Sequence, residues 1–221
     1  MQALILAGGL GTRLRPLKLN VPKPMAKVSG MPFLERLILK LKAGGITKIL
    51  LLVGYKKQQI EKHFGNGKKL GIKIGYSREQ KLLGTGGAIK NAQKLVEKQF
   101  LLFNGDTLCQ IDLPSFISFH KKHKSLLTIA VSRAKNEGGK INVATDLRVA
   151  SFGEKGAFVN AGAYVANSKI LKTIPANKKV SFEESIIPKL LVQRVFAFPL
   201  DGGFLDIGTP KRYSLANRLI K

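Results

Sequence analysis

The residues best suited to chemistry stand near the start of the chain, where glycines are followed directly by hydrogen-bond donors. Gly8, Gly9 and Gly11 lack Cβ atoms, so the backbone N–H groups around them can approach an anion closely. Thr12 and Arg13 follow at once, and both side chains can donate hydrogen bonds to phosphate oxygens. This stretch therefore predicts a loop that binds a phosphate group.

A second cation follows in a stiff segment. Pro22 and Pro24 flank Lys23, and each proline fixes its own φ angle and restricts the residue before it to extended conformations. A lysine held between two prolines has a defined place in the fold. The segment therefore predicts a positioned positive charge, close in sequence to the glycine loop.

Two other phosphate-binding patterns fit this loop poorly. A Walker A loop ends in Gly-Lys-Ser or Gly-Lys-Thr, whereas this chain has Gly11, Thr12 and Arg13 at the corresponding positions. A dinucleotide-binding fingerprint requires a third glycine, but Leu14 follows Arg13. On these residues alone, an ordinary glycine-rich turn remains the alternative to a phosphate site.

Two aspartates follow apolar segments that lie far apart in the chain. Asp106 comes shortly after the apolar run 100–103, and Asp206 comes directly after Phe204 and Leu205. A carboxylate at the carboxyl end of a central strand lies where open α/β sheets bind their ligands. The residues leave open a simple capping or turn role for Asp106.

Alternating strand and helix patterns must position these residues. The apolar run 3–7 has no polar face, which is typical of a strand buried on both sides. Similar patterns predict helices at 33–41, 56–64 and 88–97, the last opened by the glycines at 84–87, and strands at 46–53, 71–77 and 100–103. This alternation favours a doubly wound α/β fold with a mainly parallel sheet flanked by helices.

The pattern changes in the second half. After a helix at 114–123, short strands separated by turns are predicted at 126–132, 141–144, 148–152 and 158–165. They indicate a small antiparallel excursion beside the main sheet. Ser181 and Glu184 form a capping-box pattern that predicts a further helix, and a late strand is expected at 194–198. His120 and His123 are interpreted as part of an exposed basic helix face.

Composition limits the classes of protein to consider. The chain has 221 residues, of which 44% are apolar, so one well-buried α/β domain is expected. No run of about 18 apolar residues occurs, and Met1 and Gln2 lead directly into the first strand, so neither a membrane span nor a signal peptide is predicted. Cys109 is the only cysteine, which excludes an internal disulfide and favours a cytoplasmic location.

The charge balance is the most unusual bulk property. With 38 Lys and Arg against 13 Asp and Glu, the formal net charge is +25, and such a surface attracts polyanions. The cations are scattered along the chain, and neither zinc-finger spacing nor an RNP-type aromatic strand is present. We therefore expect a basic, solvated surface without a nucleic-acid partner, which helps to attract phosphorylated small molecules.

The loop also carries a specific resemblance. Gly8 to Arg13, followed by Pro16 and then by Pro22 to Met25, resembles the signature of the sugar-1-phosphate nucleotidyltransferases, with several fixed points over about 18 positions. In that family a sugar 1-phosphate attacks the α-phosphorus of a nucleoside triphosphate. The resemblance implies a Rossmann-like nucleotide-diphospho-sugar transferase fold. It also implies one domain, 1–221, with a nucleotide-binding half at about 1–111 and a sugar-phosphate-binding half at about 112–221.

The resemblance also implies roles for individual residues. It assigns nucleotide binding to Leu6, Ala7, Gly8, Gly9, Gly11, Thr12, Arg13, Gly84 and Asp106. It assigns catalysis to Arg13, Lys23, Asp106 and Lys155, and sugar-phosphate binding to Gly139, Glu154, Lys155, Asn160 and Gly162. Asp106 and Asp206 would bind Mg²⁺, a hard cation that accepts carboxylate oxygens together with substrate phosphates.

The substrates implied by the resemblance are GTP and D-glycero-D-manno-heptose 1-phosphate. Mannose 1-phosphate with GTP, and muramate or glucose 1-phosphate with UTP or dTTP, remain alternatives, as does a nucleotide- or nucleic-acid-binding protein without catalysis. The sequence departs from the family pattern at one point, because the family often has an aromatic residue where Gly138 stands before Gly139. The resemblance therefore does not define which residues form this edge of the sugar pocket. The resemblance also allows a homodimer.

Overall fold

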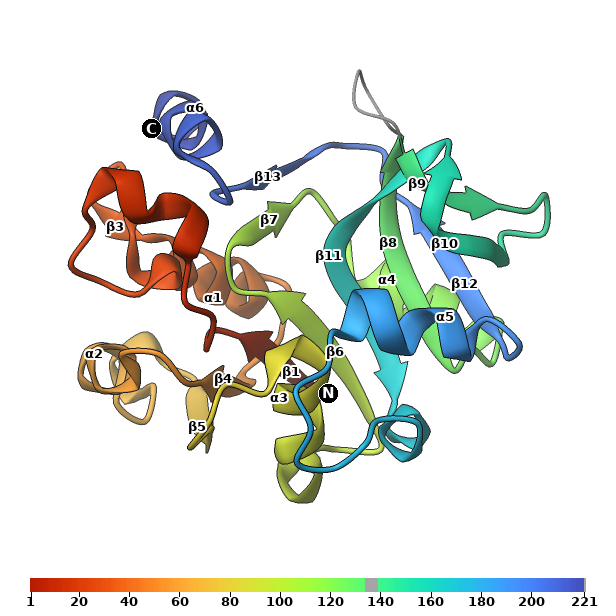
Figure 1. The fold of residues 1–221 in the computed structure, drawn as a ribbon, viewed down its shortest axis with the longest axis horizontal. Helices are drawn as coiled ribbons and strands as arrows, with labels where there is room; N and C mark the ends of the chain where they lie inside the picture. The colour runs from red at the N-terminus through yellow and green to blue at the C-terminus, as the bar shows by residue number, and fades with distance from the viewer. Residues whose placement is uncertain (134–138, 221) are drawn as a thin grey trace.

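Nine strands form one sheet with helices packed on both of its faces in the computed structural model, which describes residues 1–133 and 139–220 (Figure 1). The strand order is β10-β9-β11-β6-β1-β4-β5, with β8 paired to β11 and β12 paired to β8. The strands of this sheet are β1 (Gln2–Leu6), β4 (Lys48–Val53), β5 (Lys73–Arg78), β6 (Gln99–Asn104), β8 (Leu127–Arg133), β9 (Gly139–Val143), β10 (Val149–Gly156), β11 (Phe158–Asn167) and β12 (Val195–Pro199).

Helices and two small strand pairs complete the fold. The α-helices are α1 (Phe33–Ala43), α2 (Lys57–Phe64), α3 (Gly84–Asn91), α4 (Leu113–Lys122), α5 (Ile187–Leu190) and α6 (Pro210–Leu219). Short helical turns are η1 (Thr12–Leu17), η2 (Lys23–Met25), η3 (Lys68–Leu70), η4 (Gln93–Leu95), η5 (Ser168–Lys172) and η6 (Phe182–Ile186). The small pairs are β2 (Lys27–Val28) with β3 (Met31–Pro32), and β7 (Thr107–Cys109) with β13 (Phe204–Asp206).

The parallel part of the sheet fixes where the glycine loop lies. Strands β6, β1, β4 and β5 are parallel, so their carboxyl ends meet at one edge. Leu6 at the end of β1 is paired with Asn104 at the end of β6, and the Gly105 N–H donates to the Leu6 carbonyl at 3.0 Å. The loop after β1 and the segment that carries Asp106 therefore lie side by side.

The strands of the second half continue the same sheet. β11 is antiparallel to β6 and pairs Ala163 with Phe103, while β8 is antiparallel to β11. The predicted fold class is confirmed: a mainly parallel α/β sheet with an antiparallel portion. The structure adds that this portion is hydrogen-bonded to the parallel strands, so one continuous sheet carries both predicted halves of the site.

Burial on both faces explains the apolar run of β1. Ala3 and Ile5 face a core cluster that includes residues of α1 and α4, whereas Leu4 faces a second cluster that includes residues of α3 and α5. All three side chains are fully buried. A strand covered on both sides needs no polar face, as expected for the centre of a parallel sheet.

Helix α3 differs from its predicted extent. It begins at Gly84 and ends at Asn91, so the glycines form its first turn rather than a loop before it. The reason is close packing: a Cβ on Gly87 would lie 2.6 Å from the Lys178 carbonyl oxygen, and the Gly86 N–H donates to the Val180 carbonyl at 2.9 Å. The segment around Val180 can approach the helix only because these side chains are absent.

The exposed position expected for His120 is wrong. Its side chain is 1% exposed in α4, and its Nδ1 lies 2.8 Å from the Thr128 hydroxyl on β8. Helix α4 turns this face toward the sheet, where an unprotonated imidazole can pack.

Among the described residues, the helices are too short or too polar to cross a membrane.

Candidate active site

The glycine loop is shaped by two close neighbours. A Cβ on Gly8 would lie 2.6 Å from Oε2 of Glu79, and a Cβ on Gly11 would lie 2.9 Å from the Cβ of Lys23. Gly11 also has a φ of +61°, a region in which glycine is favoured. A Cβ on Gly9 would meet no atom within 4 Å. Gly8 and Gly11 are therefore required by packing, while Gly9 faces open space.

A cavity of about 490 Å³ opens beside this loop. It is lined by Leu6, Gly8, Gly9, Leu10, Gly11, Thr12, Arg13, Lys23, Pro24, Glu79, Leu82, Gly84, Thr85, Ala88, Asn104, Gly105, Asp106 and Lys179. Of the residues predicted to bind the nucleotide, Ala7 is the exception, because it is 1% exposed and packs in the core. The fold thus gathers the glycine loop, the start of α3 and the end of β6 around one space.

Lys23 and Asp106 meet at one end of this cavity. The Lys23 ammonium group contacts Oδ2 of Asp106, and their side chains are 11% and 26% exposed. Lys23 begins the short turn η2, whose N-cap Pro22 is extended and whose Pro24 is buried. The proline-flanked segment therefore holds the lysine in a defined position, as its sequence predicts.

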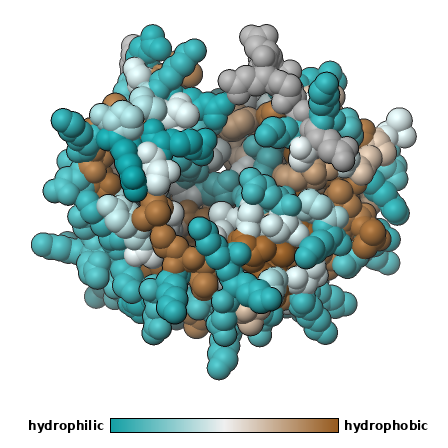
Figure 2. All heavy atoms as spheres, in the orientation of Figure 1, coloured by the Kyte–Doolittle hydropathy of each residue, from teal (hydrophilic) through white to brown (hydrophobic). Residues whose placement is uncertain are grey.

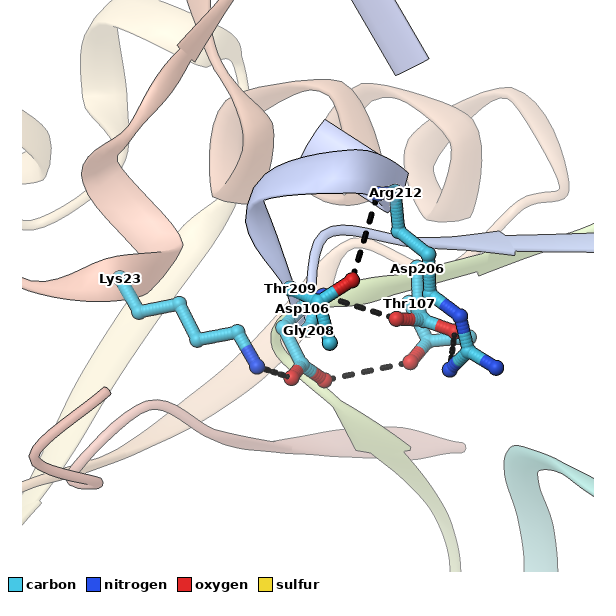
Figure 3. Close-up of polar contacts among 7 residues, drawn as sticks. All are labelled: Lys23, Asp106, Thr107, Asp206, Gly208, Thr209 and Arg212. Carbon is cyan, nitrogen blue, oxygen red and sulfur yellow. Dashed lines mark hydrogen bonds and ion pairs between the residues drawn. The ribbon is translucent and has the colours of Figure 1, made fainter. Parts of the chain in front are cut away.

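Asp206 lies next to Asp106 although the two are far apart in sequence. In the β7–β13 pair Asp206 stands opposite Thr107, and the N–H of Ile207 donates to the Asp106 carbonyl at 3.0 Å. The Asp206 carboxylate accepts from the Gly208 N–H at 2.7 Å and from Arg212 at 2.9 Å. Figure 3 shows the two aspartates in one cluster, with Lys23 reaching Asp106 and Arg212 reaching Asp206.

Cations from three segments converge on this cluster. Nη2 of Arg13 and Nζ of Lys23 each lie 3.7 Å from the position that a Cβ on Gly208 would take. The space beside Gly208 thus combines positive side chains with two carboxylates. Such a set can hold phosphate oxygens on its cations and a hard metal ion on its carboxylates.

The two aspartates fit a metal that is only partly bound by protein. In the described part of the chain, no group of three or more His, Cys, Asp or Glu residues is placed to hold a metal. Mg²⁺ is commonly bound through one or two carboxylates, with substrate phosphates and water as its other ligands. Asp106 and Asp206 would supply the protein oxygens for such an ion.

Part of the predicted sugar site packs against the end of β6. Asn160 and Gly162 lie on β11, where the Gly162 N–H donates to Oδ1 of Asn160 at 3.0 Å. Gly162 has a φ of +69°, and a Cβ there would lie 3.0 Å from the amide nitrogen of Asn104. The β11 turn is thereby packed against the residue at the end of β6, two positions before Asp106.

The other sugar-site residues lie farther out on the sheet. Gly139 is on β9 and Lys155 on β10, at the edge of the sheet beyond β11, and neither lines the cavity. The Lys155 side chain is exposed, and its carbonyl accepts from Asn142 at 2.8 Å. The side chain of Glu154 and the aromatic-to-glycine departure at Gly138 fall outside the described residues. The roles of these positions remain predictions.

The sequence-based reasoning missed Glu79. This residue directly follows β5, is 7% exposed and lines the cavity below the glycine loop. Burial raises the pKa of its carboxyl, partly offset by a hydrogen bond from the Leu83 N–H. It obeys the same rule that identified Asp106, since it too follows the carboxyl end of a parallel strand.

A polar network that was also missed joins the two halves of the site. The Thr85 hydroxyl donates to Glu183 at 2.8 Å, and the Tyr164 hydroxyl donates to the other oxygen of Glu183 at 3.4 Å. Asn160 in turn donates to the Tyr164 hydroxyl at 2.5 Å. Burial raises the pKa of Tyr164 well above its ordinary value, so the phenol stays protonated. No local signal marks this network, because it joins residues of three elements, α3, β11 and η6.

The surface around the site reflects the composition. Figure 2 shows hydrophilic side chains (teal) over most of this face, with apolar side chains (brown) gathered in a band below its centre. Because its formal net charge is +25, the whole protein attracts phosphorylated molecules electrostatically.

Comparisons with known proteins show which family the chain resembles. The family model described as nucleotidyl transferase matches residues 2–221. The chain is 41% identical to the D-glycero-alpha-D-manno-heptose 1-phosphate guanylyltransferase of Aneurinibacillus thermoaerophilus, with 99% of this chain and 97% of that protein covered. It is 37% identical to the mannose-1-phosphate guanylyltransferase of Mycobacterium tuberculosis, with 96% of this chain but only 62% of that longer protein covered.

A solved structure is similar over the whole chain. The crystal structure of HddC from Yersinia pseudotuberculosis complexed with GMP-PN has a TM-score of 0.88 and 36% sequence identity. The match covers 100% of this chain and 99% of that one. The resemblance that the sequence carries, to the sugar-1-phosphate nucleotidyltransferases, is confirmed.

Proposed function

The chain belongs to the nucleotidyl transferase family, and on that basis we propose that it joins GTP to D-glycero-α-D-manno-heptose 1-phosphate, giving a GDP-sugar and pyrophosphate. The observation that supports this most directly is the cluster of Arg13, Lys23, Asp106 and Asp206 at one end of the cavity. The names of the relatives support the choice of base and sugar. In this proposal residues 1–221 act as one nucleotidyltransferase domain.

The cavity has room for the nucleotide along its length. The base lies beside the start of α3, where Gly84 and Thr85 line the cavity, and the phosphates lie against Gly9, Thr12 and Arg13. Backbone N–H groups and the Arg13 guanidinium hold the phosphate oxygens. This placement puts the α-phosphate close to Lys23 and Asp106.

The sugar phosphate enters from the β11 side. Asn160 and Gly162 lie on β11, where Gly162 packs against Asn104 at the end of β6. Gly139, Glu154 and Lys155 are proposed to hold the sugar and its phosphate from β9 and β10. An exposed lysine on a long side chain can reach a phosphate that is already bound. Binding of the sugar phosphate then completes the site.

The reaction is an in-line displacement at phosphorus. An oxygen of the sugar phosphate forms a bond to the α-phosphorus while the bond to the β-phosphate oxygen breaks, and pyrophosphate leaves with that electron pair. Positioning and neutralisation of charge account for most of the catalysis in such transfers. Lys23 and Lys155 neutralise the reacting phosphates, and Arg13 neutralises the pyrophosphate. Mg²⁺ bound by Asp106 and Asp206 would supply further positive charge.

A matrix of substrates tests the proposal. The protein is incubated with Mg²⁺, each of four nucleoside triphosphates, and the 1-phosphates of the heptose, mannose and glucose, and pyrophosphate and NDP-sugar are measured. We expect the highest kcat/KM for GTP with the heptose 1-phosphate. A higher value for mannose 1-phosphate would favour that sugar instead. No activity across the matrix, combined with tight and salt-sensitive RNA binding, would contradict catalysis.

A further inference from the structure

One carboxylate is hydrogen-bonded to residues from both halves of the site. Glu183 lies in η6, a single π-helical turn, and such turns are rare and often found at functional sites. The segment before it packs on α3, where the Gly86 N–H donates to the Val180 carbonyl at 2.9 Å. The two carboxylate oxygens of Glu183 then reach Thr85 on α3 and Tyr164 on β11. The residue therefore joins the wall of the nucleotide cavity to the strand of the predicted sugar site.

Hydroxyl groups satisfy this carboxylate. Its Oε2 accepts from Thr85 at 2.8 Å and its Oε1 from Tyr164 at 3.4 Å, while within the described ranges no Lys, Arg or His forms an ion pair with it. An ionised carboxylate only accepts hydrogen bonds, so both hydroxyls must donate. The Thr85 hydroxyl fits this direction, because its oxygen accepts from the Phe182 N–H at 2.8 Å.

The direction of these bonds determines how Asn160 is oriented. The Tyr164 side chain is fully buried, and burial keeps the phenol protonated by raising its pKa well above the ordinary value. Because this hydroxyl gives its hydrogen to Glu183, it can only accept from Asn160, whose Nδ2 lies 2.5 Å away. The other end of the amide, Oδ1, accepts from the Gly162 N–H at 3.0 Å. Both neighbours of Asn160 therefore select the same orientation of its amide.

We propose that Glu183 is a positioning residue for the sugar 1-phosphate, and that it fixes the orientation of the Asn160 amide through the Tyr164 hydroxyl. An asparagine amide has a donor end and an acceptor end of similar shape, so its orientation decides which end a ligand meets. An amide that is already held in place need not be ordered when the ligand binds. This inference rests on the proposed use of a sugar 1-phosphate and assigns a residue that prepares that half of the site.

Two variants interrupt the hydrogen-bond chain at different points. Tyr164→Phe removes the hydroxyl and leaves the bond between Thr85 and Glu183 in place. Glu183→Gln keeps an acceptor for Thr85 but turns an NH2 group toward Tyr164, so the phenol loses the acceptor that sets its direction. In both variants KM for the heptose 1-phosphate, measured with Mg²⁺ and saturating GTP, should rise about three- to tenfold, the value of one hydrogen bond. The Kd of GTP, measured by calorimetry without sugar phosphate, should not change.

The double variant separates positioning from simple support of the fold. If Glu183 and Tyr164 act through one chain of hydrogen bonds, the double variant should raise KM for the sugar phosphate no more than either single variant does. A purely structural role predicts additive effects, together with weaker GTP binding, because Thr85 also lines the nucleotide cavity. Additive effects, or equal losses for both substrates, would overturn the proposal.

The matched control is Glu184→Gln. Glu184 is the neighbouring carboxylate on the same turn, and it is exposed. Glutamine also suits its position in the capping box with Ser181. This variant should keep both the KM for the heptose 1-phosphate and the Kd of GTP. A rise in KM equal to that of Glu183→Gln would show that any loss of charge on this turn has the same effect, and the proposal would be wrong.

A measurement without substrates separates failure of this inference from failure of the proposed function. In protein with isotope-labelled asparagine, the NMR signal of the Asn160 side-chain NH2 is assigned by its absence in Asn160→Asp. This signal should shift in Tyr164→Phe and Glu183→Gln but not in Glu184→Gln. If it stays in place in Glu183→Gln, Glu183 does not orient the amide and the inference is wrong, whatever the activity. If it shifts but the unaltered protein is inactive with every sugar 1-phosphate, the proposed function fails, and the positioning role for that substrate fails with it.

Discussion

The ammonium group of Lys23 contacts the carboxylate of Asp106, and this contact joins the proline-flanked turn η2 to the end of the central strand β6. The pair is largely shielded from solvent, with exposed fractions of 11% and 26%. Asp206 lies beside it through the β7–β13 pair. One cation and two carboxylates from three distant segments thus meet at the place proposed for phosphoryl transfer.

Replacing Asp106 should abolish most of the activity while the fold remains. Asp106→Asn removes a negative charge proposed to bind Mg²⁺, so turnover should fall roughly a thousandfold or more. Pyrophosphate release measures turnover, and circular dichroism checks the fold. Asp146→Asn, at an exposed carboxylate that does not line the cavity, is the matched control and should be close to unaltered. Near-normal turnover in Asp106→Asn would refute the assignment.

The glycines of the loop should differ in what they tolerate. In Gly8→Ala the new methyl group would meet the Glu79 carboxylate and the Gly54 backbone, so the free energy of unfolding should fall by about 1–3 kcal/mol. Gly9→Ala places the same methyl group in open space and should unfold almost as the unaltered protein does. Thermal unfolding without nucleotide measures both. Equal melting temperatures for Gly8→Ala and Gly9→Ala would show that the Glu79 side chain can move away from the new methyl group without loss of stability.

Acid should destabilise the fold through His120. Burial lowers the pKa of this imidazole from 6.5 to about 4, so the unfolded chain binds a proton below pH 6.5 that the folded protein does not. Stability should therefore decline as the pH falls from 6.5 to 4, by at most about 3 kcal/mol from this residue. Denaturant titrations at several pH values measure this loss.

Variants at two histidines isolate that effect. His120→Leu cannot gain a proton, so its stability should depend less on pH over this window, although losing the bond to Thr128 lowers stability at neutral pH. His123→Leu, at the end of the same helix, should keep the pH dependence of the unaltered protein. An unchanged pH dependence in His120→Leu would assign the acid sensitivity to other groups.

Glu79→Gln should stabilise the protein when no nucleotide is bound. Burial raises the pKa of the folded carboxyl above its ordinary 4.5, so the ionised group costs stability at neutral pH and this cost fades as the pH falls toward 4.5. A neutral amide should therefore raise the free energy of unfolding at pH 7. Thermal unfolding at pH 7 and at pH 5 checks both the gain and its decline. If the variant is less stable than the unaltered protein at pH 7, the hydrogen bond from the Leu83 N–H to the carboxylate stabilises the fold by more than burial of the charge destabilises it.

Much of the site could be predicted because its signals are local. Gly8 to Arg13 form a donor-rich loop whatever the rest of the chain does, since missing Cβ atoms and cationic side chains are properties of the residues themselves. The apolar run of β1 and the prolines around Lys23 likewise act over a few residues. Local periodicity was also sufficient to identify an α/β fold with a mainly parallel sheet.

Boundaries were less predictable where packing overrides propensity. Helix α3 starts within its glycines because the Val180 segment packs against them, and no pattern inside residues 84–97 reports that neighbour. The burial of His120 has the same origin, since it depends on β8 lying beside α4 and not on the spacing of the histidines. In both cases the deciding contact comes from a distant part of the chain.

The sequence by itself determined which chemical groups the protein has and which short segments hold them: the glycine loop, the lysine between prolines, and the aspartates after their strands. Only the tertiary structure decided which of these groups meet. Strand pairing brings Asp206 to Asp106, and the absence of a side chain on Gly8 makes room for Glu79. The physical reason is that backbone hydrogen bonds and close packing join segments regardless of their separation in the chain, whereas residue spacing reports only on near neighbours.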